Sequence, residues 1–348
     1  MDPRTSAVKK FHAPEVSPAL KYWIVLVLPL LLMGCAPAGP PLGHWFGPTT
    51  QAVVVEKSIQ LTDGTAKVLQ TTHYNIYTTI DDPVILGRIA QIMEGSFGAY
   101  EMLAEGVTPT KSPMDCYIFA KRSQWAEFTR QHTGSQAQAY LQINRGGYTR
   151  GDWYVSYYIG ESSTLSVAAH EGWHQFSFRN FRANLPPFLE EGLATMFEGV
   201  KLKNGVPRYN LSINQNRAIA LGYAINSNTT WNLEEVMGMH AGMILDRPGD
   251  KINSFYAQAW ALARFLWDGD NGAHRAALRQ MILDAADGVI YDPNGLHRNK
   301  LRGWNSAGVK GMLENYLQMD FADINTAYLQ FMHHIVNDEL PSESDEPM

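Results

Sequence analysis

The residues of this chain most suited to chemistry are His170 and His174, with Glu171 directly after the first histidine. On a helix, this spacing puts both imidazoles one turn apart on the same face, so both can bind one metal ion. Glu171 then lies about a quarter-turn away, where its carboxylate can take a proton from water at the metal without itself binding the ion. The pattern therefore predicts a metal-dependent hydrolytic site.

The sequence around this motif predicts a buried helix. Residues 163–178 begin with Ser and Thr residues that suit a helix start, and the segment then runs largely apolar. A helix buried on all sides rarely carries two histidines and a glutamate unless a partner satisfies them. This favours a metal site over a surface helix with solvated histidines. The apolar residues that cover most of the helix circumference are Leu165, Val167, Ala168, Ala169, Trp173 and Phe176.

A third ligand is expected from a neighbouring element, because a catalytic zinc ion takes three protein ligands and keeps one position open. The prolines at 186–187 predict the start of a further helix, which carries Glu190 and Glu191. Adjacent helical residues are about 100° apart, so these two glutamates cannot face the same way. Spacing alone supports a ligand role and a solvated place in the first helical turn equally. Gly192 would let another helix approach closely.

The two motifs resemble those of the gluzincin metallopeptidases, in which His-Glu-x-x-His is followed on the next helix by Glu-Gly-x-Ala. This chain reads His-Glu-Gly-Trp-His and then Glu-Gly-Leu-Ala. The resemblance implies that His170, His174 and Glu191 bind Zn²⁺ and that Glu171 is the general base. It also implies that Glu198 occupies an acidic position that recurs beside the ligands.

The whole pattern is most similar to the peptidase-MA-like domains of bacterial secreted proteins, most closely over 165–198 and more loosely over 72–335. The Gly-Ala-Met-Glu-Asn strand of the aminopeptidase branch is missing, so the resemblance does not support exopeptidase specificity. Tyr256 stands in the first turn of a predicted helix, where the resemblance implies a hydroxyl that stabilises the oxyanion of the intermediate. Ordinary core packing is the alternative for this tyrosine.

Residues 146–160, which precede the histidine helix, are rich in aromatic residues that favour strands. An edge strand at this place could pair with a substrate peptide through main-chain hydrogen bonds. Trp153 and Tyr154 point to opposite faces of such a strand, so only one of them could line a cleft. At least half of these aromatic side chains are expected to belong to the core.

The N-terminal sequence predicts export and lipid anchoring. Twelve apolar residues, 22–33, are too few to cross a bilayer, which takes about 20, but they suit the apolar part of a signal peptide. Leu-Met-Gly-Cys at 32–35 resembles a bacterial lipobox, which implies that residues 1–34 are a lipoprotein signal peptide and that Cys35 is lipidated. An ordinary secretory signal and a short membrane anchor are the alternatives. Ala36 after the cysteine favours the outer membrane.

The charge and the remaining cysteines and histidines mainly exclude other kinds of partner and site. The net charge is −6 and there is no cluster of Lys and Arg, which argues against a nucleic-acid partner. With Cys35 lipidated, Cys116 is the only other cysteine, so no intramolecular disulfide can form. Cys116 is predicted in a buried strand as a small apolar residue. The other histidines lack ligand spacing and are not predicted to bind metal.

The element pattern predicts an α+β fold of the zincin type. Strand patterns near 52–60, 66–79 and 114–120 alternate with helical patterns near 83–104 and 122–132, and the chain is mainly helical from 211 to 337. We expect a sheet-bearing N-terminal lobe and a helical C-terminal lobe with the active-site helix between them. The predicted segments are a Pro/Gly-rich tether at 35–50, an N-terminal lobe at 51–200, a C-terminal lobe at 201–337 and a disordered tail at 338–348.

Taken together, the sequence predicts a zinc-dependent peptide-bond hydrolase, an endopeptidase acting on peptides or proteins in the bacterial cell envelope. Two alternatives stay open. One is a peptidoglycan amide hydrolase, and the other is a non-catalytic envelope lipoprotein that keeps the zincin fold as a binding module.

Overall fold

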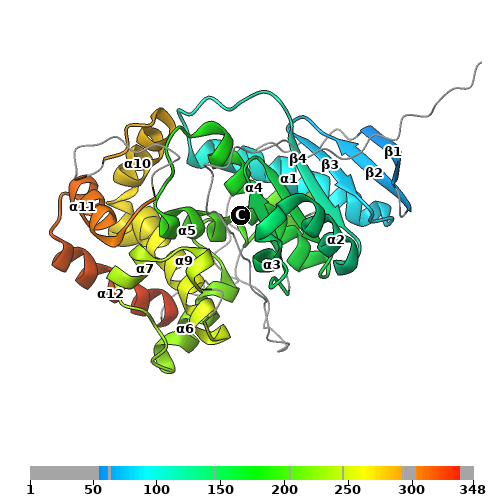
Figure 1. Cartoon of the computed structure of the whole chain (residues 1–348). Coiled ribbons are helices and arrows are strands. Elements are labelled where there is room, and N and C mark those ends of the chain that lie inside the picture. The colour runs from blue at the N-terminus through cyan, green and yellow to red at the C-terminus, as the bar shows by residue number, and fades with distance from the viewer. Residues whose placement is uncertain are drawn as a thin grey trace, which may run out of the picture.

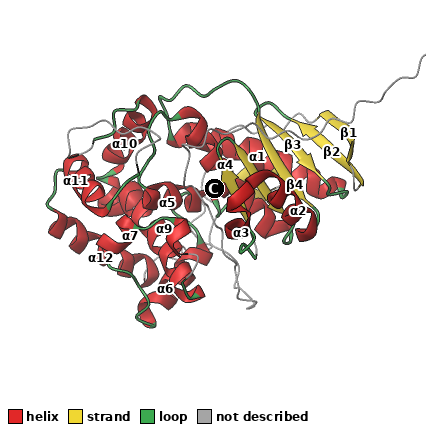
Figure 2. Ribbon diagram, in the orientation of Figure 1, coloured by secondary structure: helices red, strands yellow, loops and turns green. Residues whose placement is uncertain are grey.

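The fold has a β-sheet in its N-terminal part and is helical in its C-terminal part (Figure 1; Figure 2). The computed structural model describes residues 55–61, 64–144, 146–203, 205–244, 247–291, 293 and 303–337. The N-terminal sheet and the helical C-terminal part confirm the expected combination of strands and helices.

Within these residues, six strands form the main sheet in the order β1-β2-β3-β4-β6-β5. The pairs β3/β4 and β4/β6 are parallel, and the pairs β1/β2, β2/β3 and β5/β6 are antiparallel. Strand β5 is thus an edge strand. The strand bounds are β1 (Val55–Leu61), β2 (Gly64–Gln70), β3 (Tyr74–Thr78), β4 (Met114–Phe119), β5 (Gly147–Arg150) and β6 (Trp153–Tyr157).

Helices cover both faces of this sheet. Because strand side chains alternate between faces, Cys116 and Ile118 of β4 pack into the core shared with α1 (Pro83–Leu103) and α4 (Glu161–Asn180). Tyr117 and Phe119 pack on the opposite face against residues of α2 (Arg122–Thr133) and α3 (Ala137–Tyr140), and the short helix η1 (Gly134–Gln136) joins these two helices.

The C-terminal part is built from helices around α9, a long helix in its centre (Figure 1). A small hairpin of β7 (Lys201–Lys203) and β8 (Val206–Arg208) links it to the preceding part. The helix bounds are α5 (Pro187–Phe197), α6 (Gln215–Asn226), α7 (Leu233–Gly238), α8 (Ala241–Ile244), α9 (Gly249–Gly272), α10 (Arg275–Asp287), α11 (Ser306–Leu317) and α12 (Phe321–Asn337).

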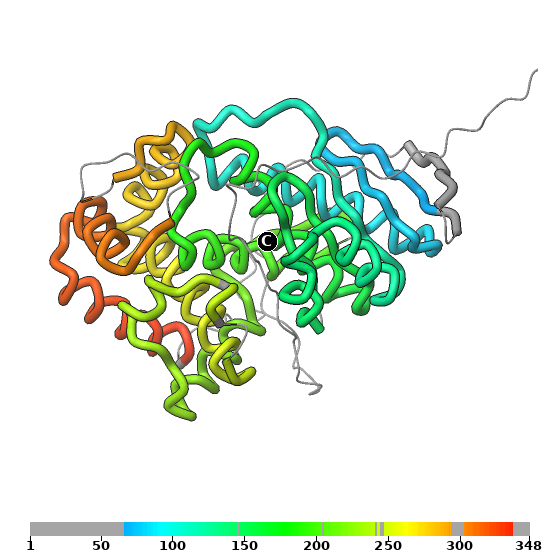
Figure 3. Tube along the Cα trace, viewed as in Figure 1, coloured from blue at the N-terminus to red at the C-terminus, as the bar shows by residue number. Residues whose placement is uncertain are grey.

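Helices α4 and α5 lie in the middle of the molecule, between the sheet and the C-terminal helices (Figure 3). Two glycines allow unusually close helix packing here. A Cβ on Gly192 of α5 would stand 2.4 Å from the carbonyl oxygen of Ala259 on α9, and one on Gly172 of α4 would stand 2.6 Å from the hydroxyl of Tyr100 on α1. One continuous apolar core consequently runs from the sheet through α4 and α5 into the C-terminal helices.

The structure corrects three expectations from the sequence. The strand expected at 66–79 is two strands, β2 and β3, joined by a turn in which the backbone N–H of Thr71 donates to the carbonyl of Tyr74 at 2.9 Å. The stretch 146–160 is the hairpin β5/β6 rather than one strand, because Gly151 turns the chain with φ +68°. The hairpin β7/β8 was not expected.

Other expectations are confirmed or lie outside the described residues. Helices at 83–104 and 122–132 match α1 and α2, and Cys116 is buried on β4. The expected signal peptide, the tether with Cys35 and the tail at 338–348 lie outside the described residues. Within the described part of the chain, no helix combines the length and apolar character needed to cross a membrane.

Candidate metal centre

The histidine helix α4 is fixed against the sheet next to the site. Gln175, which follows His174, donates from its amide to the carbonyl oxygens of Asp115 and Asp152, at 3.0 and 2.9 Å. Its amide oxygen accepts the thiol proton of Cys116. These bonds tie α4 to β4 and to the β5/β6 turn. Every side chain from Thr164 to Ser177 is buried except Ser166, as the all-round apolar pattern predicted.

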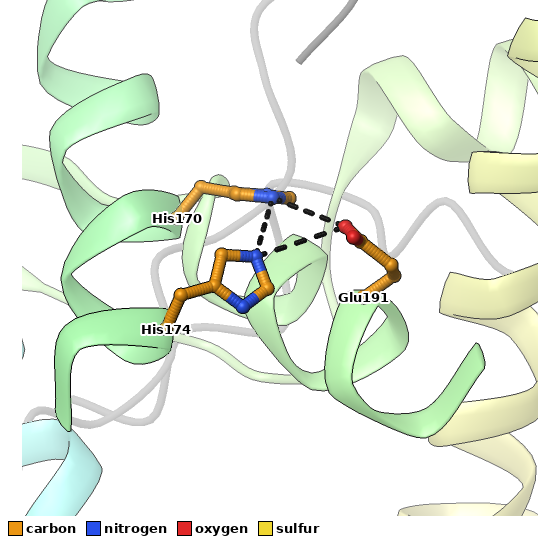
Figure 4. A group of neighbouring side chains, drawn as sticks. All are labelled: His170, His174 and Glu191. Carbon is orange, nitrogen blue, oxygen red and sulfur yellow. Dashed lines mark hydrogen bonds and ion pairs between the residues drawn. The ribbon is translucent and has the colours of Figure 1, made fainter. Parts of the chain in front are cut away.

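The two histidines and Glu191 converge on one point, as Figure 4 shows. The Nε2 atoms of His170 and His174 are 3.2 Å apart. Oε2 of Glu191 lies 3.4 Å from Nε2 of His170 and 3.7 Å from Nε2 of His174. All three side chains are at most 5% exposed. Helices α4 and α5 therefore bring together the three residues expected as ligands.

The spacing of these atoms fits a tetrahedral ion. Ligand atoms about 2.0–2.1 Å from zinc at tetrahedral angles lie about 3.3 Å from one another. The observed separations of 3.2, 3.4 and 3.7 Å bracket this value. These three residues thus supply atoms at the spacing of three vertices of a tetrahedron.

The hydrogen bonds behind the histidines make the converging atoms electron-rich. Nδ1 of His170 lies 2.9 Å from Oε1 of Glu198, and Nδ1 of His174 lies 3.0 Å from Oε1 of Glu190. An ionised carboxylate only accepts hydrogen bonds, so each Nδ1 carries the proton and each Nε2 of a neutral ring keeps its lone pair. Oε2 of Glu191 is buried and accepts no hydrogen bond among the described residues. Two lone pairs and an anionic oxygen at one point require a cation or a proton.

Glu198 is held by a second set of bonds. Arg217 of α6 donates to both of its oxygens, from Nε to Oε2 at 2.8 Å and from Nη2 to Oε1 at 2.7 Å. The amide of Asn214 donates to Oε2 at 3.0 Å. Burial opposes ionisation, but the charge of Arg217 and the bond with His170 outweigh it and lower the pKa of Glu198 to about 2. Glu198 therefore stays an anion and keeps His170 oriented.

Glu190 orients His174 through the corresponding hydrogen bond to Nδ1. The hydroxyl of Ser177, on α4, donates to the same Oε1 that accepts from Nδ1 of His174. Glu190 and Glu191 point different ways, as adjacent helical residues must, yet both serve the site. Glu191 supplies a converging oxygen, whereas Glu190 orients a histidine from behind.

Glu171 is fully buried and interacts electrostatically with all three converging residues. Burial raises its pKa to about 7, although the two histidines and a hydrogen bond from Thr149 act in the opposite direction. The hydroxyl of Thr149, on the edge strand β5, lies 2.8 Å from Oε2 of Glu171. A bound divalent cation would add its own charge and favour the carboxylate form.

Tyr256 and His240 lie around the site without joining the converging atoms. Tyr256 was expected in the first turn of its helix, but α9 begins earlier, at Gly249, so Tyr256 lies beyond the first turn. Its side chain is fully buried, and the guanidinium of Arg217 sits over its ring at 5.2 Å. His240, between α7 and α8, is partly exposed, and burial lowers its pKa despite the opposing effect of Glu191. His240 was not singled out in the sequence, since it has no ligand spacing to another histidine.

Sequence reasoning missed the parts of the site that depend on tertiary contacts. Thr149 and Arg217 come from elements far from the motif in sequence, and neither belongs to a local pattern that marks it. The role of Glu190 could have been found, because it directly precedes the expected ligand on the same helix.

No protein-family model matches this chain, and no curated protein matches it.

Proposed function

We propose that this chain is a zinc-dependent peptide-bond hydrolase of the gluzincin type, with a zincin-like fold, that acts as an endopeptidase. The observation that carries the proposal is the convergence of His170, His174 and Glu191 from two consecutive helices, with Glu171 buried beside them. By its lipobox, the enzyme would be anchored through Cys35 in the bacterial cell envelope, facing the periplasm or the exterior.

The donor set favours zinc. Two imidazole nitrogens and one carboxylate oxygen with tetrahedral spacing are the ligands of many catalytic zinc sites, whereas Mg²⁺ and Ca²⁺ take six or more oxygen ligands. The carboxylates of Glu198 and Glu190 behind the histidines are also typical, since they fix the ring orientation and increase the basicity of the ligand. Oε2 of Glu191, which is buried and accepts no hydrogen bond among the described residues, fits the same assignment.

Each side chain then has a stated role in peptide hydrolysis. Zinc, when bound, supplies a Lewis acid and lowers the pKa of water to about 7. Glu171 takes a proton from the attacking water and later passes it to the leaving amine nitrogen. Tyr256 donates its hydroxyl proton to the developing oxyanion in this scheme. His170, His174 and Glu191 hold the ion throughout.

The edge strand β5 supports a peptide as substrate. Strand β5 pairs with β6 on one side and, among the described residues, has no strand on the other. An extended peptide could add to this free edge through main-chain hydrogen bonds. Thr149 places β5 directly beside Glu171, so a peptide on that edge would lie next to the general base.

The aromatic side chains Tyr148, Trp153, Tyr154 and Tyr157 are all buried and belong to the core.

Two substitutions in the full-length protein test the proposal. Glu171→Gln should keep zinc and lose activity, because the ligands remain but the base is gone, whereas His170→Ala should lose both. His333→Ala, an exposed histidine on α12, is the control and should retain both. Activity is measured on an unfolded protein and, in parallel, on murein fragments.

The outcomes separate the candidate functions. Cleavage of murein fragments alone would favour the peptidoglycan amide hydrolase. A zinc-loaded wild-type protein that cleaves neither substrate would favour the non-catalytic binding module. A Glu171→Gln protein as active as the wild type would remove Glu171 from the mechanism.

A further inference from the structure

The hydroxyl of Thr149, on the edge strand β5, bonds to the buried carboxylate of Glu171. In the described part of the chain, no other side-chain hydroxyl of β5 does so. Oγ1 of Thr149 lies 2.8 Å from Oε2 of Glu171 and 3.2 Å from the main-chain oxygen of the same glutamate. A hydroxyl has one proton, and the shorter distance and the negative charge both favour the carboxylate oxygen. Thr149 therefore donates to Oε2.

The two oxygens of this carboxylate are consequently not equivalent. Oε2 has a fixed donor, whereas Oε1 is buried and has no hydrogen-bond partner among the described residues. A buried, unpartnered carboxylate oxygen is costly unless water or substrate completes it. Oε1 is therefore the oxygen of Glu171 that is available to accept a proton.

The backbone explains why Thr149 can do this. Tyr148 packs with the aromatic cluster on the α2 and α3 face of the sheet, so the next residue, Thr149, must point to the α4 face. Thr149 is also only 4% exposed, which confines its side chain. The hydroxyl that holds Glu171 thus belongs to the strand that, among the described residues, has no further strand on its outer side.

We propose that Thr149 is a positioning residue that holds Oε2 of Glu171 so that Oε1 performs the proton transfers. This inference rests on the proposed hydrolase function. One O–H bond of water breaks as an Oε1–H bond forms, and the water oxygen bonds to the amide carbon while the π pair of the C=O bond moves onto the carbonyl oxygen. The same proton then moves from Oε1 to the amide nitrogen as the C–N bond breaks and the C=O π bond re-forms. Thr149 keeps its own proton throughout.

Three variants of the full-length, zinc-loaded protein test the assignment. Thr149→Val removes the hydroxyl at nearly constant volume and should lower kcat roughly 10- to 100-fold, as expected for a lost hydrogen bond to a charged group, with KM little changed. Thr149→Ser restores the hydroxyl and should recover kcat to within about threefold of the wild type. Thr78→Val is the matched control, a buried strand threonine whose hydroxyl donates to the carbonyl of Ile118 at 2.7 Å, and should leave kcat unchanged.

A second readout does not depend on turnover. Acetohydroxamic acid gives up its hydroxyl proton when it binds beside a general base, so calorimetry should find about tenfold weaker binding to Thr149→Val and near-normal binding to Thr149→Ser. Zinc content is measured for every variant and should not change.

Several results would overturn the assignment. Thr149→Val with wild-type kcat, or Thr149→Ser as impaired as Thr149→Val, would show that the hydroxyl does not matter. If Thr149→Val does not fold, a crystal structure of the wild type decides, since a Thr149 Oγ1 to Glu171 Oε2 distance above about 3.5 Å excludes the bond. Full activity of Glu171→Gln would instead remove the proposed function itself, which separates the two failures.

Discussion

Nδ1 of His170 lies 2.9 Å from Oε1 of Glu198, a residue 28 positions later in the chain. Glu198 also accepts two hydrogen bonds from Arg217, which lies over the ring of Tyr256. A chain of contacts thus connects α6 and α9 to the histidine on α4. The orientation of His170 is set from outside the motif that the sequence displays.

These contacts predict that substitutions at Arg217 and Glu198 have coupled effects on stability. Arg217→Met should destabilise the protein by about 3–5 kcal/mol, because it leaves the Glu198 carboxylate buried without its cation. The double variant Arg217→Met/Glu198→Gln should recover most of that loss in a denaturant titration, since a neutral amide can still accept from His170. The same double variant should bind zinc roughly 10- to 100-fold more weakly than the wild type. Additive losses in stability would contradict the coupling.

Gly192 predicts a link between helix packing and the metal centre. A Cβ at this position would meet the carbonyl oxygen of Ala259 at 2.4 Å, so Gly192→Ala should push α5 away from α9 and cost about 1–3 kcal/mol. Zinc affinity should fall as well, because Glu191 precedes this glycine. Gly87→Ala, on the exposed side of α1 with open space around it, is the control and should be neutral or stabilising. Thermal unfolding with and without zinc measures both variants.

Tyr256→Phe separates the two readings of this buried tyrosine. If its hydroxyl stabilises the oxyanion, kcat should fall by about 10²- to 10³-fold while zinc content and the melting temperature stay near wild type, since the ring under Arg217 remains. Unchanged kcat together with lower stability would assign Tyr256 to the core instead. Steady-state kinetics on a peptide substrate makes the distinction.

Zinc binding should release a proton from His170. Burial alone would lower the pKa of this imidazole, but the neighbouring carboxylates of Glu191, in ion-pair contact with Nε2, and of Glu198, bonded to Nδ1, outweigh burial and raise the pKa to about 9. At pH 7.5, below that pKa, the ring is protonated and must lose its proton to bind the ion, so affinity should rise with pH until about pH 9. Calorimetry in buffers of different ionisation enthalpy measures the release. Zinc binding with no proton release at pH 7.5 would contradict this account.

Local patterns predicted the helices well and the turns poorly. The helices at the histidine motif and at 83–104 have long apolar patterns, which predict a helix without knowledge of tertiary contacts. The turn between β2 and β3 was hidden by Thr71 and Thr72, because threonine favours strands even though its hydroxyl can also bond within a turn. The hairpin β7/β8 did carry a signal, since Asn204-Gly205 is a common turn pair.

The same division holds for the site. His170, Glu171 and His174 share one helix, so their spacing predicts their proximity. The ligand role of Glu191 was predicted from the resemblance, because the spacing on α5 did not distinguish Glu191 from Glu190. Thr149 and Arg217 reach the site only through the sheet hairpin and through α6, and no local sequence rule encodes such a contact.

The metal content of the purified full-length protein tests the central claim most directly. Elemental analysis at neutral pH should find about one zinc per wild-type chain and the same for Glu101→Ala, an exposed glutamate on α1. Glu191→Ala should contain little zinc while remaining folded, because it loses the oxygen ligand. A wild-type protein that stays metal-free when supplied with zinc, or a Glu191→Ala protein that holds zinc as tightly as the wild type, would contradict the account.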